Sequence, residues 1–278
     1  MVANVYQHFR ADERAFIDSV GDWIEQVQGQ YAPYLTEFLD PRQSYILETL
    51  IRQSSDLRFM FYGGYEQAER KRCLIFPDYY EPVEEDFETA LYEIHYPSKF
   101  ASLSHGKILG TLVGTGIKRS YFGDIISDGD RWQVFIANEV DHFVAAQVTK
   151  IGKVAVRLEP IKYTEMILPK DSWTQERGTV SSMRLDSVIS EIYNISRQRS
   201  KQLIEAGKVK VNWTENTRPD FVLELLDIIS VRGYGRVQIQ ELEGKTKKKK
   251  STGCCSVYYV NKIKRWFTHG FNSIRYPK

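Results

Sequence analysis

The 278-residue chain contains few cysteines and no long hydrophobic run. Its three cysteines, Cys73, Cys254 and Cys255, are too few and too unevenly spaced for a disulfide framework or a zinc site. No stretch of about 18 apolar residues is present, so the sequence predicts no membrane span. The first ten residues lack the basic start and apolar core of a secretory signal. These absences favour a cytoplasmic protein without a structural metal.

Motifs that carry catalysis are also missing. His95, His105 and His142 are scattered, and no His-Glu-x-x-His or His/Cys spacing indicates a metal. Serine, histidine and aspartate occur without the glycine-flanked setting of a nucleophile. We therefore expect no enzyme, no catalytic residue, no cofactor and no small-molecule substrate.

The net charge of +2 hides a strong asymmetry. Residues from 181 onward hold nineteen of the 38 Lys and Arg but nine of the 36 Asp and Glu, a net charge of +10. The first 180 residues therefore carry a net charge of −8. This distribution indicates that contact with a polyanion is concentrated at the C-terminal end.

The residue patterns predict an α+β protein that begins with a helical N-terminal segment over residues 1–55. Apolar side chains recur at helical spacing between Phe16 and Val27. Asp40 and Gln43 flank Pro41 as a capping box does at the start of a second helix. This segment indicates packing and no chemistry.

Residues 56–160 predict a mixed domain with an RRM-like (split βαβ) arrangement. The sequence lacks the aromatic motif with which RRM sheets stack on RNA bases, so we expect no base stacking on this sheet. Glycines 106, 110, 114 and 116 are interpreted as positions that let a helix pack closely against the sheet. The expected strands are 72–76, 87–95, 121–126, 132–136 and 153–158, and the expected helices 104–113 and 138–148.

Residues 181–244 predict a small module of two helices followed by strands. Leu185, Val188, Ile189 and Ile192 recur at the spacing of one apolar helix face. A second helix is expected from an N-cap at Ser196 to a C-cap glycine at position 207, followed by a strand at 208–212.

Cations and glycine turns in this module suit phosphate groups. For any single cation a solvated surface is the ordinary interpretation, but three different elements deliver them here. The candidate RNA-binding residues are Arg184, Arg197, Ser200, Lys201, Lys208, Lys210, Asn212, Arg232 and Arg236.

Several motifs of this module resemble the S4-type RNA-binding domain, in order and at its spacing. They are Arg184-Leu185-Asp186, Ser196-Arg197, Val209-Lys210-Val211-Asn212 and Arg232-Gly233-Tyr234-Gly235-Arg236. Two departures are Trp213, where most members have glycine, and Leu226-Asp227, where many have Gly-Asp. The resemblance covers about sixty residues.

Residues spread over about 5–245 resemble the bacterial YlmH family. They include Leu35-Thr36-Glu37-Phe38-Leu39-Asp40-Pro41, Gly63-Gly64-Tyr65, Phe122-Gly123-Asp124 and Val211-Asn212-Trp213. The resemblance implies a cytoplasmic, non-enzymatic factor that binds rRNA of the large ribosomal subunit and an obstructed peptidyl-tRNA, in ribosome-associated quality control. It implies contacts to rRNA and tRNA by Arg184 and Arg197. Two basic pairs upstream are candidates for a secondary RNA contact, with solvated charge as the alternative: Arg70 and Arg72, and Lys118 and Arg119.

An alternative function is a cell-division adaptor that binds protein partners, with RNA binding secondary. An RNA-modifying enzyme is a weaker option, because fewer than forty residues follow Gln240. Residues 161–180 are expected to be a linker. Residues 245–278 are expected to be a basic, aromatic tail. Its lysine run at 245–250 is typical of a disordered segment, and whether residues 251–278 fold is left open. A contact of residues 251–278 with RNA or a membrane surface is left open, and an extension without a role is the favoured interpretation.

Overall fold

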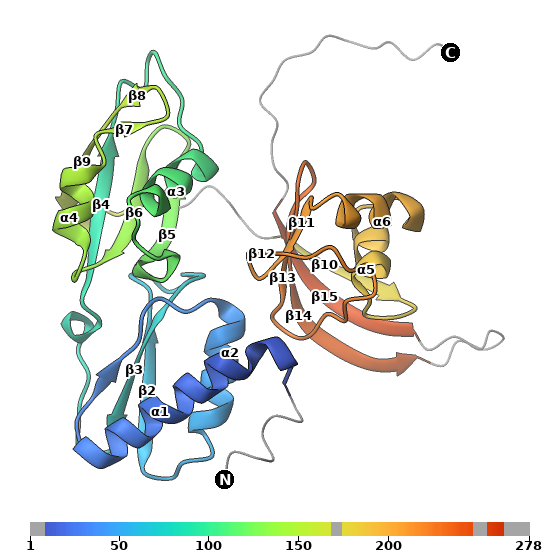
Figure 1. Cartoon of the computed structure of the whole chain (residues 1–278), viewed down its shortest axis with the longest axis horizontal. Helices are drawn as coiled ribbons and strands as arrows, with labels where there is room; N and C mark the ends of the chain where they lie inside the picture. Colours follow the sequence, from blue (N-terminus) through green and yellow to red (C-terminus); the bar gives the residue numbers. More distant parts are fainter. Residues whose placement is uncertain (1–8, 168–173, 247–254, 264–278) are drawn as a thin grey trace. The chain divides into compact units, whose positions relative to one another are not determined.

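The computed structural model describes residues 9–167, 174–246 and 255–263, and the chain divides into two compact units, 1–171 and 172–278 (Figure 1). The N-terminal part of the first unit is a three-stranded sheet of order β1-β3-β2 packed with two helices. Its elements are η3 (Ala11–Glu13), α1 (Arg14–Gln30), β1 (Tyr34–Leu35), α2 (Pro41–Ile51), β2 (Leu57–Tyr62) and β3 (Arg72–Pro77).

The domain boundary expected after residue 55 is wrong. The strand expected at 72–76 forms as β3, but it pairs with β1 and β2 and not with the sheet of the middle domain. The reason is burial: Cys73 and Ile75 of β3 pack with Val20 of α1 and Leu47 of α2. The capping box at the start of α2 is confirmed, since the Asp40 carboxylate accepts from the Gln43 N–H at 2.8 Å. The N-terminal part therefore extends to about residue 80.

The middle domain has the expected split βαβ topology, with an antiparallel sheet of order β5-β6-β4-β9. Both helices lie on one face of this sheet, where Ile108 and Leu112 of α3 and Val144 of α4 are buried. The elements are η4 (Glu84–Phe87), β4 (Thr89–His95), α3 (His105–Gly114), η5 (Arg119–Tyr121), β5 (Phe122–Ser127), β6 (Trp132–Ala137), α4 (Asp141–Gln147), β7 (Lys150–Ile151), β8 (Val154–Ala155), β9 (Arg157–Ile161) and η6 (Tyr163–Glu165).

The glycines of α3 do not serve close packing. A Cβ atom added at Gly106, Gly110 or Gly114 would meet no heavy atom within 4 Å, and all three residues are exposed. Glycines four residues apart do share a helix face, but Ile108 and Leu112 occupy the face that meets the sheet. The interpretation of the glycine spacing is therefore corrected.

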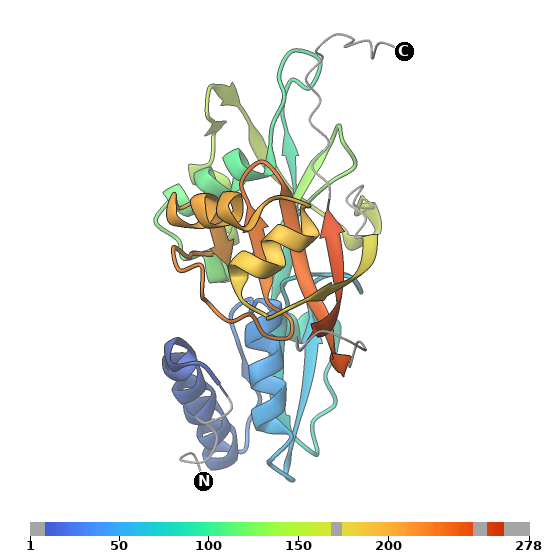
Figure 2. The same cartoon turned by 90° about the vertical axis from the view of Figure 1, so that its right-hand side faces the viewer.

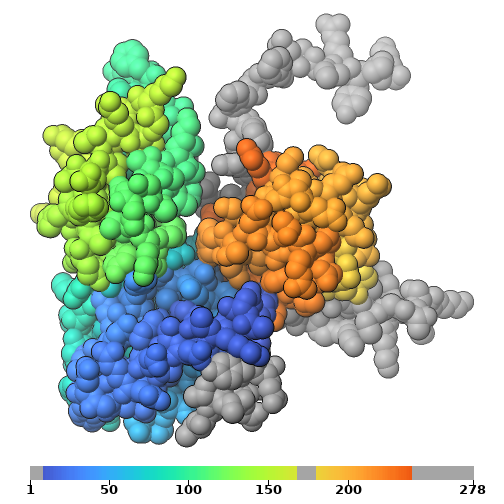
Figure 3. Space-filling view, in the orientation of Figure 1, coloured from blue at the N-terminus to red at the C-terminus, as the bar shows by residue number. Residues whose placement is uncertain are grey.

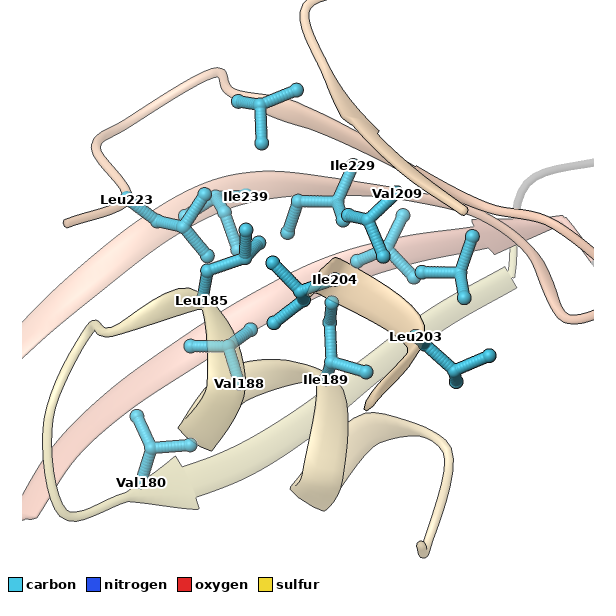
Figure 4. Close-up of a cluster of buried hydrophobic side chains, with 13 residues drawn as sticks. Val180, Leu185, Val188, Ile189, Leu203, Ile204, Val209, Leu223, Ile229 and Ile239 are labelled. Atoms are coloured by element: carbon cyan, nitrogen blue, oxygen red, sulfur yellow. The ribbon is translucent and has the colours of Figure 1, made fainter. Parts of the chain in front are cut away.

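The second unit places two helices on a sheet of order β10-β15-β14-β13-β11-β12 (Figure 2). Figure 4 shows the core between them, where Leu185, Val188 and Ile204 of the helices point toward Val209 and Ile229 of the sheet. The elements are β10 (Thr174–Val180), α5 (Leu185–Ile192), α6 (Arg197–Glu205), β11 (Val209–Val211), β12 (Thr214–Glu215), β13 (Ile228–Val231), β14 (Gly235–Thr246) and β15 (Cys255–Ile263).

Two boundaries of the expected linker and tail are corrected by this sheet. Residues 174–180, expected in a linker, form β10 and pair with β15. Residues 255–263 of the tail, whose folding the sequence left open, form β15 between β10 and β14. The remaining tail residues, 247–254 and 264–278, lie outside the described residues.

Candidate nucleic-acid interface

Two arginines of the second unit share one buried carboxylate. Arg184 is the N-cap residue of α5 and Arg197 is the first residue of α6. The Arg184 Nε lies 3.1 Å from Asp186 Oδ1, and an Arg197 terminal nitrogen lies 3.2 Å from each Asp186 oxygen. Asp186 is fully buried, while the Arg184 and Arg197 side chains are 40% and 53% exposed. The carboxylate thus holds two guanidinium groups whose remaining donors are open to solvent.

The cluster exists because the starts of α5 and α6 meet at Asp186. The Leu185 N–H donates to the Phe221 carbonyl at 2.8 Å, which caps the start of α5 with the loop before β13. The Ser196 hydroxyl caps α6 by accepting from the Arg199 N–H at 3.1 Å. Because each arginine stands at a helix start, neither side chain is covered by a preceding helical turn.

Ser200 is not available as an RNA contact, contrary to the sequence prediction. It is fully buried, and its hydroxyl donates to the Asp186 carbonyl oxygen at 2.9 Å. This bond fixes α6 against the start of α5. Ser200 is therefore a structural residue of the cluster.

Burial alone would raise the pKa of Asp186, but hydrogen bonds from Arg184 and Arg197 outweigh it and hold that pKa below its ordinary value. The hydrogen bond to Asp186 in turn raises the pKa of Arg184. Because the pKa of Asp186 is lowered in the folded state, its ion pairs stabilise the fold fully above the unfolded-state pKa of about 4. This contribution to the free energy of unfolding is lost as the pH falls through the folded-state pKa. The Asp186 carboxylate is therefore charged at neutral pH.

We expect Asp186→Asn to weaken RNA binding although it removes a negative charge. The variant loses the charged acceptor, so the two arginines lose their fixed positions and must pay conformational entropy on binding. Unfolding stability should fall by about 2 kcal/mol, the scale of hydrogen bonds to a charged group. Filter binding and urea unfolding measure the two effects. Tighter RNA binding by Asp186→Asn would contradict this expectation. It would show that losing a negative charge near RNA matters more than holding the two arginines in position.

Four other predicted cations belong to the opposite face of the sheet. Val209 and Val211 of β11 point into the core, so Lys208 and Lys210 point away from the helices. The register pairs Lys210 with Ser230, and Ser230 with Arg236, which continues the same row. Arg232 follows the buried Val231 and lies on that face as well.

The nine predicted residues therefore do not form one surface. Arg184 and Arg197 lie at the helix starts, and the exposed Lys201 lies one turn beyond Arg197. The other four cations lie on the face of the sheet that points away from the helices. The spacing along the chain could not reveal this, because strand alternation and helix periodicity set the two groups independently.

Asn212, another candidate RNA contact, is half-buried and also holds a turn. Its Nδ2 donates to Asp227 Oδ1 at 2.8 Å and its Oδ1 accepts from the Ile228 N–H at 2.9 Å. Asn212 and Trp213 have φ values of 47° and 64°, as in a type I′ hairpin turn. The Asn212 side chain thus ties the β11–β12 turn to β13. The tryptophan occupies a conformation that glycine ordinarily supplies.

Arg70 and Arg72, the first pair predicted to make a secondary RNA contact, are buried. Arg72 is 2% exposed, donates to the carbonyl of Thr36 at 2.7 Å and pairs with Glu139 at 2.7 Å. Arg70 is 6% exposed and donates to the Phe38 carbonyl at 2.6 Å. These arginines join the N-terminal part to the middle domain and cannot contact RNA.

The second basic pair is divided between structure and surface. Arg119 is half-buried and donates to the carbonyls of Phe122 and Gly123. Lys118 is exposed and remains a candidate. The family motif Phe122-Gly123-Asp124 begins strand β5.

Asp186, which accepts from both arginines, is not among the candidate residues that the sequence predicts. The Arg184-Leu185-Asp186 motif contains it, but sequence alone does not show that this acid holds the two arginines in place.

Within residues 9–167, 174–246 and 255–263, no group of His, Cys, Asp and Glu could hold a metal ion. Among the helices of those same residues, none has the length and apolar character needed to span a bilayer.

Comparisons with known proteins match nearly the whole chain. Family models match residues 12–80 ("YlmH, N-terminal"), 82–165 ("Putative RNA-binding domain in YlmH") and 183–229 ("S4 domain"). A Bacillus subtilis relative, "Ribosome-associated protein quality control protein P2", is 44% identical over 249 residues, which is 90% of this chain and 96% of the relative. A solved structure, "Cell division protein ylmH from Streptococcus pneumoniae", is 40% identical with a TM-score of 0.51, covering 58% of this chain and 98% of that one.

Proposed function

Because the chain belongs to the YlmH family, we propose that it is a non-enzymatic factor that binds rRNA and tRNA on the large ribosomal subunit. Its work would be the quality control of stalled peptidyl-tRNA complexes, in the cytoplasm. The observation that supports this function best is the pair of half-exposed arginines held by Asp186 at the start of two helices. The printed name of the Bacillus subtilis relative supports the ribosomal setting.

The mechanism would be occupancy and not chemistry. A guanidinium presents several donors in a fixed plane that matches phosphate oxygens. Arg184 and Arg197 each use part of that plane on Asp186 and keep the rest for a ligand. Since the arginines are already positioned, less conformational entropy is lost when RNA binds. Structured RNA hides its base edges, so recognition would follow the spacing of phosphates more than sequence.

Co-sedimentation with purified large ribosomal subunits over a series of salt concentrations tests this mechanism. If Arg184, Arg197 and Lys201 each neutralise a phosphate, the logarithm of the binding constant should fall with the logarithm of salt with a slope of about −3 or steeper. Binding that does not weaken as salt rises would contradict phosphate recognition.

A division adaptor is the second candidate, favoured by the printed title of the Streptococcus pneumoniae structure. In this case the acidic first unit would hold a protein partner, with RNA secondary. A pull-down with and without ribonuclease separates the two functions. Ribosomal proteins that disappear after nuclease treatment support the ribosomal function. Division proteins that persist, with no ribosomal protein in either sample, support the adaptor.

A further inference from the structure

The sheet face that RRM-like domains use for RNA is closed in this middle domain. Alternation along β4 and β6 places Leu91, Gln133 and Phe135 on the face away from α3 and α4, and they are at most 1% exposed. Tyr65 stacks on Phe135 at 5.6 Å between ring centroids. The Ile167 N–H donates to the Gln133 side-chain oxygen at 2.9 Å. RNA bases therefore cannot reach the central strands of this sheet.

One end of the domain is open instead. Strand β4 ends at His95, opposite Arg157 at the start of β9, so residues 96–104 and the β7–β8 hairpin emerge at the same end of the sheet. Helix α3 begins at this end and contacts β7. Both views show this end pointing away from α1 and α2 (Figures 1 and 2). The green of α3 and the yellow-green around the hairpin adjoin at the surface in Figure 3.

This distal end carries an exposed aromatic ring. Phe100 is 91% exposed, the highest exposure among the large exposed hydrophobic residues of the described chain. The turn that holds it is ordered, because the N–H groups of Phe100 and Ala101 both donate to the Pro97 carbonyl at 3.0 Å. An aromatic ring on a fixed turn, beside Lys99, is suited to stacking on an unpaired base.

Cations outnumber acids at this end of the domain. Residues 97–123 and 142–158 hold seven Lys and Arg and no Asp or Glu. Of these cations, the exposed ones at the distal end are Arg157, which pairs with Glu159, and Lys99, Lys107, Lys150 and Lys153. The acids nearest in the fold are largely matched: Asp128 pairs with Arg131 at 3.0 Å, and Glu159 pairs with Arg157 at 2.5 Å. Asp130 on the β5–β6 turn is the exception and lowers the net charge by one.

We propose that this distal patch, defined as Lys99, Phe100, Lys107, Lys150 and Lys153, is a second RNA-binding surface, which takes a single-stranded or looped segment. The lysines would neutralise backbone phosphates while Phe100 stacks on one base. This inference rests on the proposed ribosomal function and adds a contact from the middle domain. Cβ atoms added at Gly106 and Gly110, on either side of Lys107 in α3, would meet nothing within 4 Å, so this exposed part of the helix is uncrowded.

The test is a full-length patch variant with Lys99→Glu, Phe100→Ala and Lys153→Glu. A matched control carries Arg58→Glu, Tyr79→Ala and Lys162→Glu, which change the same charges and one exposed aromatic ring elsewhere in the first unit. Binding to purified large ribosomal subunits should weaken about tenfold or more in the patch variant and change less than about twofold in the control. Equal affinities of the patch variant and the unmodified protein would overturn the proposal.

Two further arms separate stacking and partner type. Phe100→Trp should keep the affinity, whereas Phe100→Leu should lose it as Phe100→Ala does, and a leucine variant that binds normally would exclude stacking. A photoreactive benzophenone amino acid at position 100 should crosslink to RNA. A crosslink to protein alone would overturn RNA as the ligand. If the Arg184→Ala/Arg197→Ala variant loses binding and the patch variant does not, the ribosomal function stands and only this inference fails.

Discussion

Full-length protein carrying both Arg184→Ala and Arg197→Ala is expected to lose co-sedimentation with large ribosomal subunits. Each guanidinium offers charge-assisted hydrogen bonds that contribute about 1.5–3 kcal/mol, so the double variant should bind about 100-fold more weakly or worse. The salt dependence should also become shallower by about two phosphate contacts. The fold should persist at reduced stability, because both arginine side chains are half-exposed but the fully buried Asp186 loses both of its charged partners.

The control for this experiment replaces arginines that lie outside the cluster. Arg52 and Arg218 are 67% and 71% exposed in their side chains and each pairs with a nearby acid. The double variant Arg52→Ala/Arg218→Ala has the same charge change and should bind subunits normally. A lysine pair at positions 184 and 197 should bind with intermediate affinity, because lysine keeps the charge but not the planar fork. Full binding by the alanine pair would refute the assignment of the site.

Gly64→Ala is expected to destabilise the first unit more than any surface change. Gly64 has a φ of 93°, and a Cβ atom there would lie 2.1 Å from the Phe135 ring. The ring is fully buried and stacked on Tyr65, so it cannot move away without opening the core. Backbone strain of 1–3 kcal/mol and overpacking of similar size add up to about 4 kcal/mol. The melting temperature should fall by about 10 °C.

Gly110→Ala is the matched control for Gly64→Ala. Gly110 lies within α3, and an added Cβ would meet nothing within 4 Å. Alanine should therefore stabilise the helix by up to about 1 kcal/mol. Thermal unfolding of the two variants measures both effects. Equal melting temperatures for Gly64→Ala and the unmodified protein would contradict the described packing between the N-terminal part and the middle domain.

Strongly periodic segments could be predicted from the sequence. The spacing of Leu185, Val188, Ile189 and Ile192 predicted α5, and the helix and strand order predicted the split βαβ topology. The N-terminal sheet was missed because β1 consists of two residues, which is too short for an alternating pattern. No strand is expected at β2 (Leu57–Tyr62) either, so the sequence shows neither partner of β3 and places β3 in the middle domain.

The candidate site shows the same division between local and non-local information. Motifs identified Arg184 and Arg197, whose positions at helix starts follow from local sequence. Burial of Ser200 and Arg72 depends on contacts with residues 14 and 36 positions away, which no local pattern encodes. Only the folded structure shows that Arg184 and Arg197 both donate to the Asp186 carboxylate, so the role of Asp186 in holding them could not be predicted from the sequence.

Crosslinking the full-length protein to RNA in cells, followed by sequencing of the attached RNA, tests the central claim most directly. The predicted result is enrichment of rRNA from the large subunit and of tRNA, with the enrichment lost in the Arg184→Ala/Arg197→Ala variant. RNA recovered at background level, or an enrichment that is unchanged in that variant, would contradict the claim that the Asp186-held arginine pair binds ribosomal RNA.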